Sequence, residues 1–313
     1  MQSPAQGIRE GPGREVPRRT DKEIEERDLN RGRLEGVSRR AMGKLLGIAV
    51  GLWLLSGVFF TLETLRPART QPRWRRDSKT DVAYFFFTGV VTRPVGTLAA
   101  VVALVLSALA AGYQLRPGAV QAYIQERTLM RELPVLVQLV VGLFLADFIG
   151  YWTHRGFHRF RTLWRFHAVH HSSEDLDWLS SARVHPVNAA ISRFLLVLLL
   201  IPFGFDVKVL GTVGPLLTLY GLFLHANVRV PFGPLRYLVA SPAFHRWHHS
   251  ADERGMGKNF AGLFPVLDLV FGTFHLPSEG PERFGVAGER LPDGLLRQMW
   301  YPFRARRLRG AAE

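Results

Sequence analysis

The sequence predicts an all-α protein embedded in a membrane. Long apolar runs alternate with strongly charged segments, so a chain of 313 residues that is 47% hydrophobic also carries a formal net charge of +14. No long stretch shows the alternation of apolar and polar residues that marks a half-buried strand. Helices that cross a bilayer, joined by charged segments outside it, account for both observations.

Residues 1–40 contain almost no large apolar side chains and many Arg, Glu, Gly and Pro residues. Such a segment cannot bury enough apolar surface to order itself, so residues 1–40 are predicted to form a disordered basic N-terminal tail. From Leu45 to Leu65 the chain is apolar and has a single charged residue, Glu63. This run is long enough to cross a bilayer.

Further apolar runs predict additional membrane helices. Val82–Leu115 is interrupted by an Arg-Pro pair, so it forms either one kinked span or a re-entrant pair. Pro134–Ile149 leads directly into a group of histidines. Phe194–Phe205 and Val209–Leu224 are each short for a full span and are predicted to form a hairpin. We expect four or five membrane helices in total, because buried helices of a soluble protein fit the length of the first run poorly.

The charge distribution favours a cytoplasmic position for the segments that contain histidine. Both flanks of the first span are basic, so they do not decide its orientation. The histidine segments carry many arginines, which favours the cytoplasm: Arg155, Arg159, Arg161, Arg165, Arg183, Arg246 and Arg254. The basic tail and loops are expected to meet anionic lipid head groups. No nucleic-acid-binding motif is present, and the chain contains no cysteine that could form a disulfide or a thiolate ligand.

Eight of the eleven histidines fall into three clusters, namely His154 with His158, then His167 with His170 and His171, then His245 with His248 and His249. Residues three or four apart share one face of a helix, so each cluster presents two or three imidazoles from one side of a helical turn. Imidazole is the commonest metal-ligating side chain. Eight of them exceed what one ion needs, so the clusters predict two metal ions.

Asp147 and Tyr151 precede the first cluster at helical spacing, on the same stripe as His154 and His158. A carboxylate inside an apolar span is costly and therefore marks a candidate functional residue. Asp147 is expected either to accept a hydrogen bond from a metal-binding imidazole or to pair with a nearby arginine at the membrane surface.

The two triplets are predicted to lie on short helical segments outside the membrane. The Ser and acidic residues that follow each triplet are expected to accept hydrogen bonds from the imidazoles. His225 ends the last apolar run and is expected to be a ninth ligand. His185 comes just before a helix that starts with proline, so it is either a further ligand or a residue at the start of that helix. His275 is expected to be structural.

This pattern resembles the fatty acid hydroxylase/sterol desaturase superfamily, which consists of membrane-bound histidine-box di-iron oxygenases. The resemblance covers about residues 80–277. Beyond the histidine clusters it extends to Asp147, Tyr151-Trp152, Arg183 with His185-Pro186, His225-Ala226-Asn227, Lys258-Asn259-Phe260, Leu267-Asp268 and Phe271-Gly272-Thr273. Family members usually have Trp at the position of Leu267, a difference that concerns packing rather than chemistry.

The resemblance implies a centre of two iron ions that uses O2 to hydroxylate or desaturate an aliphatic C–H bond of a lipid. Sterols, fatty acyl chains, carotenoids and ether lipids all qualify as substrates. The implied ligands are His154, His158, His167, His170, His171, His225, His245, His248 and His249. Asp147, Tyr151 and Asn259 would support these ligands without binding metal.

The residues alone leave the metal open, because nitrogen ligands suit iron, zinc and copper alike. The chain has no His-Pro-Gly-Gly haem motif and no cysteine cluster, so an oxygenase of this kind needs electrons from a separate protein. Two other functions stay open. A zinc-dependent membrane hydrolase would usually have a carboxylate base close to its ligands, and a non-enzymatic metal carrier would place its ligands at mid-membrane.

The predicted organisation has three parts. A membrane-embedded hydroxylase or desaturase domain spans residues 41–277, after the tail at 1–40, and a C-terminal extension covers 278–313. A cytoplasmic helical lobe of this domain is expected to carry the di-metal site. The Arg-rich and Ala/Gly-rich composition favours a bacterial cytoplasmic membrane, with the metal site facing the cytoplasm.

Overall fold

The computed structural model describes residues 21–126 and 128–304, and the chain divides into two compact units at Gly47. Helix α1 runs from Asp21 to Leu65. Residues 21–40, predicted to be disordered, are therefore helical, while residues 1–20 lie outside the described part of the chain. Glu, Arg and Leu, which are good helix formers, dominate this segment. The segment also continues directly into the apolar part of α1. It therefore extends an existing helix and avoids the free-energy cost of starting a new one.

Five helical segments are long and apolar enough to cross a membrane, which confirms the expected number. They are Glu35–Leu65, Ser78–Ala110, Val135–Arg159, Pro186–Phe203 and Val207–His225. Large apolar side chains on these segments face outward, for example Leu98 and Leu106, as a lipid environment requires. The described residues contain isolated bridges but no strand. The all-α prediction is confirmed.

The segment Ser78–Ala110 is one continuous helical stretch rather than a re-entrant pair. Helix α2 (Ser78–Phe87) continues through a π-helical turn (Thr88–Thr92) into α3 (Arg93–Ala110). Pro94 lies in the first turn of α3. A proline there removes a backbone donor and disturbs the hydrogen-bond ladder, and the wider π turn accommodates the disturbance without a break in the helix.

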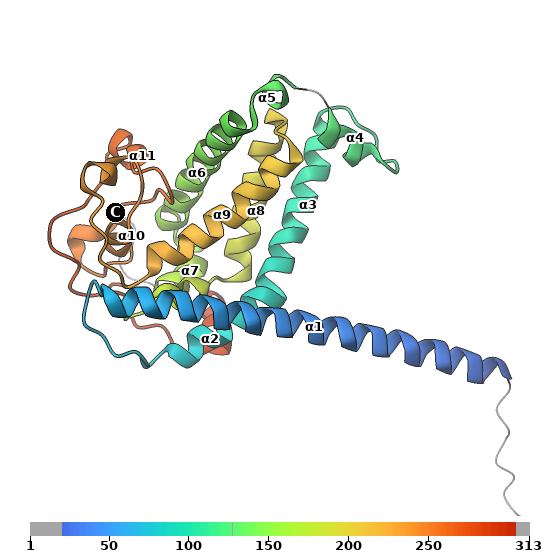
Figure 1. Cartoon of the computed structure of the whole chain (residues 1–313), viewed down its shortest axis with the longest axis horizontal. Coiled ribbons are helices and arrows are strands. Elements are labelled where there is room, and N and C mark those ends of the chain that lie inside the picture. The colour runs from blue at the N-terminus through green and yellow to red at the C-terminus, as the bar shows by residue number, and fades with distance from the viewer. Residues whose placement is uncertain (1–20, 127, 305–313) are drawn as a thin grey trace, which may run out of the picture. The chain divides into compact units, whose positions relative to one another are not determined.

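Helices α6 (Val135–Arg159), α8 (Pro186–Leu200) and α9 (Val207–His225) form the bundle that supports the site, and α3 packs along α8 (Figure 1). The bundle core is apolar: Ala146, Ile149, Leu200, Phe205, Val209 and Val213 are all buried. Gly142 on α6 leaves room for the ring of Phe205. This packing fixes α6 relative to α8 and α9 close to the histidines.

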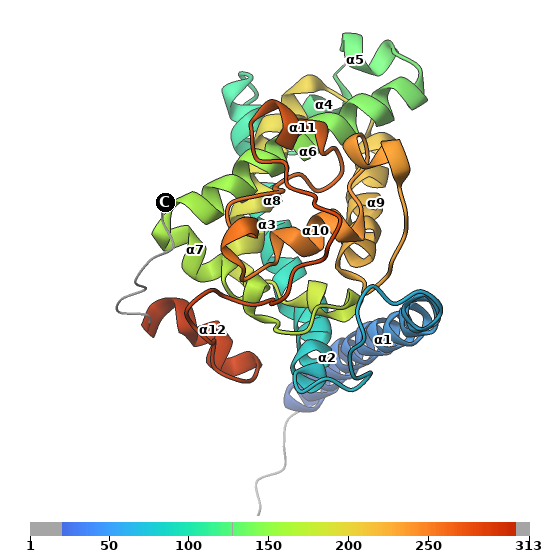
Figure 2. The same cartoon turned by 90° about the vertical axis from the view of Figure 1, so that its left-hand side faces the viewer.

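Shorter helices form a lobe at one end of this bundle (Figures 1 and 2). The two triplets lie on short helical segments, as predicted. The first lies at the end of α7 (Arg161–His167) and in a 3₁₀ turn (His170–Ser172). The second lies in α10 (Pro242–His248), and its last member, His249, directly follows that helix. Two short helices, α4 (Ala119–Gln125) and α5 (Leu129–Glu132), lie at the other end of the bundle (Figure 1). The described elements not yet named are α11 (Val266–Val270), α12 (Leu295–Arg304) and 3₁₀ turns at Trp178–Ala182, Ile201–Phe203, Gly233–Tyr237 and Glu253–Gly255.

Part of the predicted C-terminal extension packs into the lobe. Leu291 and Tyr301 belong to one buried apolar cluster with Tyr84 of α2 and Trp164 of α7. The described residues beyond 277 therefore complete the core next to the first triplet.

A buried ion-pair network joins the segment before α2 to the turn before α8. Arg75 pairs with Asp81 at 2.7 Å and with Asp177 at 2.5 Å. Arg183 pairs with Asp81 and lies 3.2 Å from Asp77. The side chains of Arg183 and Asp81 are inaccessible to solvent. Buried charges must be paired to be tolerated, so this network fixes the backbone around Arg183.

Candidate metal centre

The structure brings together nine histidines that are far apart in the sequence. His154 and His158 lie on successive turns at the end of α6, and His225 is the last residue of α9. The triplets on α7 and α10, with the residues that follow these helices, supply the other six. Ring contacts link all three clusters, with centroids 4.3 Å apart for His154 and His248 and for His171 and His249.

The nine imidazoles form two groups, within each of which the candidate ligand atoms lie within 4.8 Å of one another. One group is His154, His158, His167, His171 and His248; the other is His170, His225, His245 and His249. Each triplet contributes to both groups. The two groups therefore lie side by side, as a two-metal centre requires.

Oxygen atoms around the site hold five of these rings by their Nδ1 atoms. The acceptors are backbone carbonyls of Phe260 for His154, Arg183 for His170, Gly221 for His225 and Lys258 for His248, at 2.7–3.2 Å, and Asn188 Oδ1 for His167 at 2.9 Å. A neutral imidazole that donates from Nδ1 has a free lone pair on Nε2. Each of these rings therefore presents Nε2 as its metal-binding atom.

The contacts between these lone pairs fit a metal ion. The Nε2 atoms of His154 and His167 are 3.0 Å apart, and those of His170 and His225 are 3.2 Å apart. Two unprotonated nitrogens at this distance repel each other. Two nitrogens at a right angle around one ion, with bonds of about 2.1 Å, would be about 3.0 Å apart. A cation shared by the two nitrogens would replace this repulsion with coordination.

Buried nitrogens without partners give the same indication. Within the described part of the chain, His158 and His248 each have a buried Nε2 atom, and His245 and His249 a buried Nδ1 atom, with no hydrogen-bond partner. Buried polar atoms in folded proteins are nearly always paired, so unpaired nitrogens in one cluster mark a ligand site.

Burial keeps the imidazoles of both triplets neutral. It lowers the pKa of every histidine in the triplets well below its usual value, and repulsion from neighbouring imidazoles acts in the same direction; these are His167, His170, His171, His245, His248 and His249. Neutral imidazole is the form that binds metal.

The partners of the imidazoles differ from those that the sequence predicted. The Ser and acidic residues after each triplet accept no hydrogen bond from the five rings whose Nδ1 partners are given above. Ser172 donates to the carbonyl of Val169. Asp252 accepts the backbone N–H of Glu282 at 2.8 Å and pairs with Arg283. Both triplets end in a turn that directs these side chains away from the rings. Backbone carbonyls take their place.

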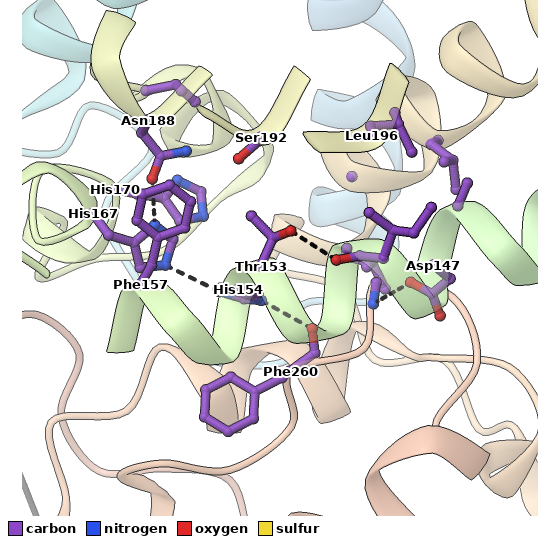
Figure 3. Close-up of a pocket in the computed structure, with 18 of the residues that line it drawn as sticks. Asp147, Thr153, His154, Phe157, His167, His170, Asn188, Ser192, Leu196 and Phe260 are labelled. Atoms are coloured by element: carbon purple, nitrogen blue, oxygen red, sulfur yellow. Dashed lines mark hydrogen bonds between the residues drawn. The ribbon is translucent and has the colours of Figure 1, made fainter. Parts of the chain in front are cut away.

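Asp147 does not bind an imidazole, contrary to our expectation, and it does not pair with an arginine. Its carboxylate accepts the backbone N–H groups of Gly262, Leu263 and Phe264 at 2.7–3.1 Å. This loop continues from Phe260, whose carbonyl accepts the Nδ1–H of His154 (Figure 3). Asp147 lies two turns before His154 on α6, too far along the helix axis to reach its ring. It therefore holds the loop that holds the ring.

Tyr151 and Asn259 also support the site from a distance. The Tyr151 hydroxyl lies 2.8 Å from Thr273 Oγ1. Asn259 has a positive φ of 59°, and its amide bonds to the backbone at Phe244 and His275. It thereby joins the segment at Lys258, whose carbonyl is the partner of His248, to α10. Leu267 is buried against Tyr151, in agreement with a packing role.

The two remaining histidines lie outside both groups. His185 caps α8, where its Nδ1 accepts the backbone N–H of Val187 at 3.1 Å, and its ring contacts Phe166 and Phe303. The ring of His275 meets Trp247 edge-on. Sequence reasoning did not identify Asn188, the partner of His167, because a single asparagine in an apolar helix carries no distinguishing signal.

A cavity of about 350 Å³ lies among α6, α8 and α9 and ends at the histidines. Its walls are mainly apolar, and His154, His167, His170, His225 and His245 close one end. Figure 3 shows His154, His167 and His170 beside Asn188 at this end. The fold and the site define a membrane protein with a buried, all-histidine metal-binding centre that a cavity between membrane helices reaches.

Comparison with known proteins gives a family match in the central region of the chain. Residues 139–273, which include all nine histidines, match the family model described as Fatty acid hydroxylase. The resemblance predicted from the histidine pattern is therefore confirmed for this region. No solved structure gives a significant match.

Three relatives illustrate the similarity. The chain is 33% identical to ornithine lipid hydroxylase OlsE of Rhizobium tropici, over 54% of this chain and 51% of that protein. It is 35% identical to alkylglycerol monooxygenase of Danio rerio over 41% of this chain, and 32% identical to that of Homo sapiens over 43%. The match spans 28% and 30% of those two proteins, so the chain covers at most about half the length of these relatives.

Proposed function

We propose that this protein is a membrane-bound, O2-dependent oxidoreductase that hydroxylates an aliphatic C–H bond of a lipid. The observation that carries the proposal is the cavity between membrane helices that ends at two adjoining groups of histidines. A substrate dissolved in the bilayer can enter such a cavity without crossing water. The names of the relatives, a lipid hydroxylase and alkylglycerol monooxygenases, support oxygen insertion rather than desaturation.

In this proposal the nine histidines bind two iron ions, one in each group. With O2 and electrons from a separate protein, the irons supply the oxidising power that an unactivated C–H bond requires. The chain itself supplies orientation: hydrogen bonds from Nδ1 fix five rings so that Nε2 faces inward. The apolar cavity walls bind the hydrocarbon chain and exclude water from the reacting carbon.

Two alternative functions are less well supported. A zinc hydrolase needs a carboxylate base near its ligands, and neither histidine group includes an Asp or Glu among the described residues. A metal carrier would place its ligands at mid-membrane. Here His154 and His158 lie in the last turns of α6, and His225 is the last residue of α9.

The proposed location is a bacterial cytoplasmic membrane, with the metal centre facing the cytoplasm. The arginines around the histidine segments support this orientation. A cytoplasmic site would also be accessible to a soluble electron-transfer protein.

Metal analysis combined with isotope labelling tests the proposal. We expect purified protein to bind two irons per chain and, when supplied with reductant and bacterial lipid, to transfer label from isotopic O2 into a lipid alcohol. Tight zinc binding with label incorporated only from water would support the hydrolase instead. Bound metal without any lipid product would support the carrier.

A further inference from the structure

The cavity has a polar end and an apolar end. Along α8, Asn188 and Ser192 line the part nearest the histidines, and Leu196 lines the next turn. Along α6, Thr153 lies beside His154, whereas Ile149 and Ala146 line the part further into the span. Asp147 also borders that part, but its carboxylate oxygens already accept three backbone N–H groups. The two helices run in opposite directions, so both place their polar residues at the same end (Figure 3).

This polar end offers hydrogen-bond donors that the protein does not use. Asn188 Oδ1 accepts from His167 Nδ1 at 2.9 Å, which fixes the orientation of the amide and leaves its Nδ2 group on the cavity side, facing Ser192 in Figure 3. In the described structure, neither Asn188 Nδ2 nor Ser192 Oγ makes a hydrogen bond to another residue. Thr153 donates to the carbonyl of Ile149 at 2.8 Å, so its hydroxyl can only accept.

Asn188 and Ser192 are only partly buried and line the cavity, so a ligand that enters it can pair with their free donors. We propose that Asn188 and Ser192 bind a hydrogen-bond-accepting oxygen of the lipid substrate, such as an ether or carbonyl oxygen. This inference rests on the proposed function. The hydrogen bonds from Asn188 and Ser192 orient the lipid with its polar group beside the metal centre and its hydrocarbon chain along α6 and α8 towards the middle of the membrane.

The orientation agrees with the position of the site in the bilayer. The polar end of the cavity lies near the C-terminus of α6 and the N-terminus of α8, where head groups are found, and the apolar end lies where acyl chains are found. The carbon that reaches the metals is then close to the polar group. Ser192 and Asn188 thus select oxidation next to an oxygen function over oxidation in the middle of a chain.

Binding of two matched lipids tests this inference without relying on turnover. Methyl hexadecyl ether and octadecane have equal length and differ by one oxygen atom. We expect the full-length protein, loaded with zinc in nanodiscs, to bind the ether more tightly. Ser192→Ala should reduce that preference about fivefold, the effect of losing one hydrogen bond, and leave octadecane binding unchanged. Ser107→Ala, in α3 and outside the cavity, is the matched control and should keep the full preference.

Equal binding of both lipids by the unaltered protein would overturn the inference, as would identical behaviour of the two serine variants. With iron-loaded protein and reductant, product analysis adds a second readout, because we expect oxidation at the carbons next to the ether oxygen. Oxidation of the ether in mid-chain would overturn the inference but leave the proposed function intact. If neither lipid nor any bacterial lipid is oxidised while the binding preference holds, the proposed function fails instead.

Discussion

Asp147 and His154, two turns apart on α6, hold the two ends of one short loop. The carboxylate of Asp147 accepts three backbone N–H groups between Gly262 and Phe264, and His154 donates through Nδ1 to the carbonyl of Phe260 at 2.9 Å. One helix thus fixes the loop, and the loop fixes the ring on the same helix. The position of His154 therefore depends on a residue that does not touch it.

Replacing Asp147 should loosen the metal site in proportion to the hydrogen bonds lost. Asp147→Asn keeps one oxygen acceptor, so we expect a partial loss of bound metal. Asp147→Leu leaves three partly buried N–H groups unpaired, at up to about 1–3 kcal/mol each, and should be more severe. We expect metal affinity to fall by about 10–100-fold for the more severe variant, measured by metal retention against a chelator.

Asp206 provides the control for this prediction. It caps α9 by accepting the backbone N–H of Lys208 at 2.7 Å and lies at the opposite end of that helix from His225. Asp206→Asn should weaken the cap but retain metal. Full metal retention in both Asp147 variants would show that the loop keeps its place without the carboxylate.

His170 and His248 belong to different groups, so each should govern one metal. His170→Ala and His248→Ala are each expected to abolish turnover and to lower bound metal from two ions per chain towards one, because an open coordination shell loses its ion. Elemental analysis of the purified variants measures this. Unchanged metal content and activity in either variant would contradict the two-metal arrangement.

His225 should behave like the triplet histidines, whereas His275 should not. His225 Nε2 lies 3.2 Å from His170 Nε2 and 3.3 Å from His245 Nε2, while the ring of His275 packs against Trp247. We expect His225→Ala to lose metal and His275→Ala to keep it. Equal and full metal loading in the two variants would remove His225 from the ligand set.

The histidine spacing predicted the site better than its supporting interactions. Residues three and four apart tend to share a helical face, so the spacing indicated that the imidazoles of each triplet lie close together. It did not indicate that each triplet divides between the two groups. The partners of the rings carry no such pattern. Phe260, Arg183 and Lys258 act through backbone carbonyls, which every residue has.

The same limit applies to Asp147. Its cost inside an apolar span marked it as a functional candidate, but its partners lie 115–117 residues further along the chain. Only the fold brings that loop to α6. The prediction of disorder, which rested on composition, was likewise wrong for residues 21–40. A helix that continues from an apolar span needs no buried surface of its own.

The N-terminal residues should be dispensable for the metal site. The nine histidines and their partners all lie in the compact unit that begins at Ile48. A truncated chain beginning at Ala41 should therefore bind as much metal as the full chain and keep its activity in reconstituted vesicles. Loss of metal on truncation would show that residues 1–40 contribute to the site.

Arg183 connects the buried ion-pair network to the metal centre. Its side chain pairs with Asp81 and Asp77, and its carbonyl accepts the Nδ1–H of His170 at 3.2 Å. Removing one partner of a buried pair costs about 3–5 kcal/mol. We expect Arg183→Leu to lower the thermal unfolding midpoint strongly. Arg183→Lys should have a smaller effect, because lysine keeps the charge but cannot form the paired hydrogen bonds of the guanidinium.

If the network positions His170, Arg183→Lys should also lose metal from the group of four histidines while most of the protein stays folded. Arg290→Lys is the matched control, because among the described residues Arg290 pairs with Glu174 and Asp293 alone, in exposed contacts that contribute little to stability. Unfolding midpoints and metal contents measured together separate the two roles of Arg183. A lysine variant that unfolds earlier but keeps both metals would limit Arg183 to stabilising the fold, since the carbonyl that holds His170 would then be fixed by other contacts.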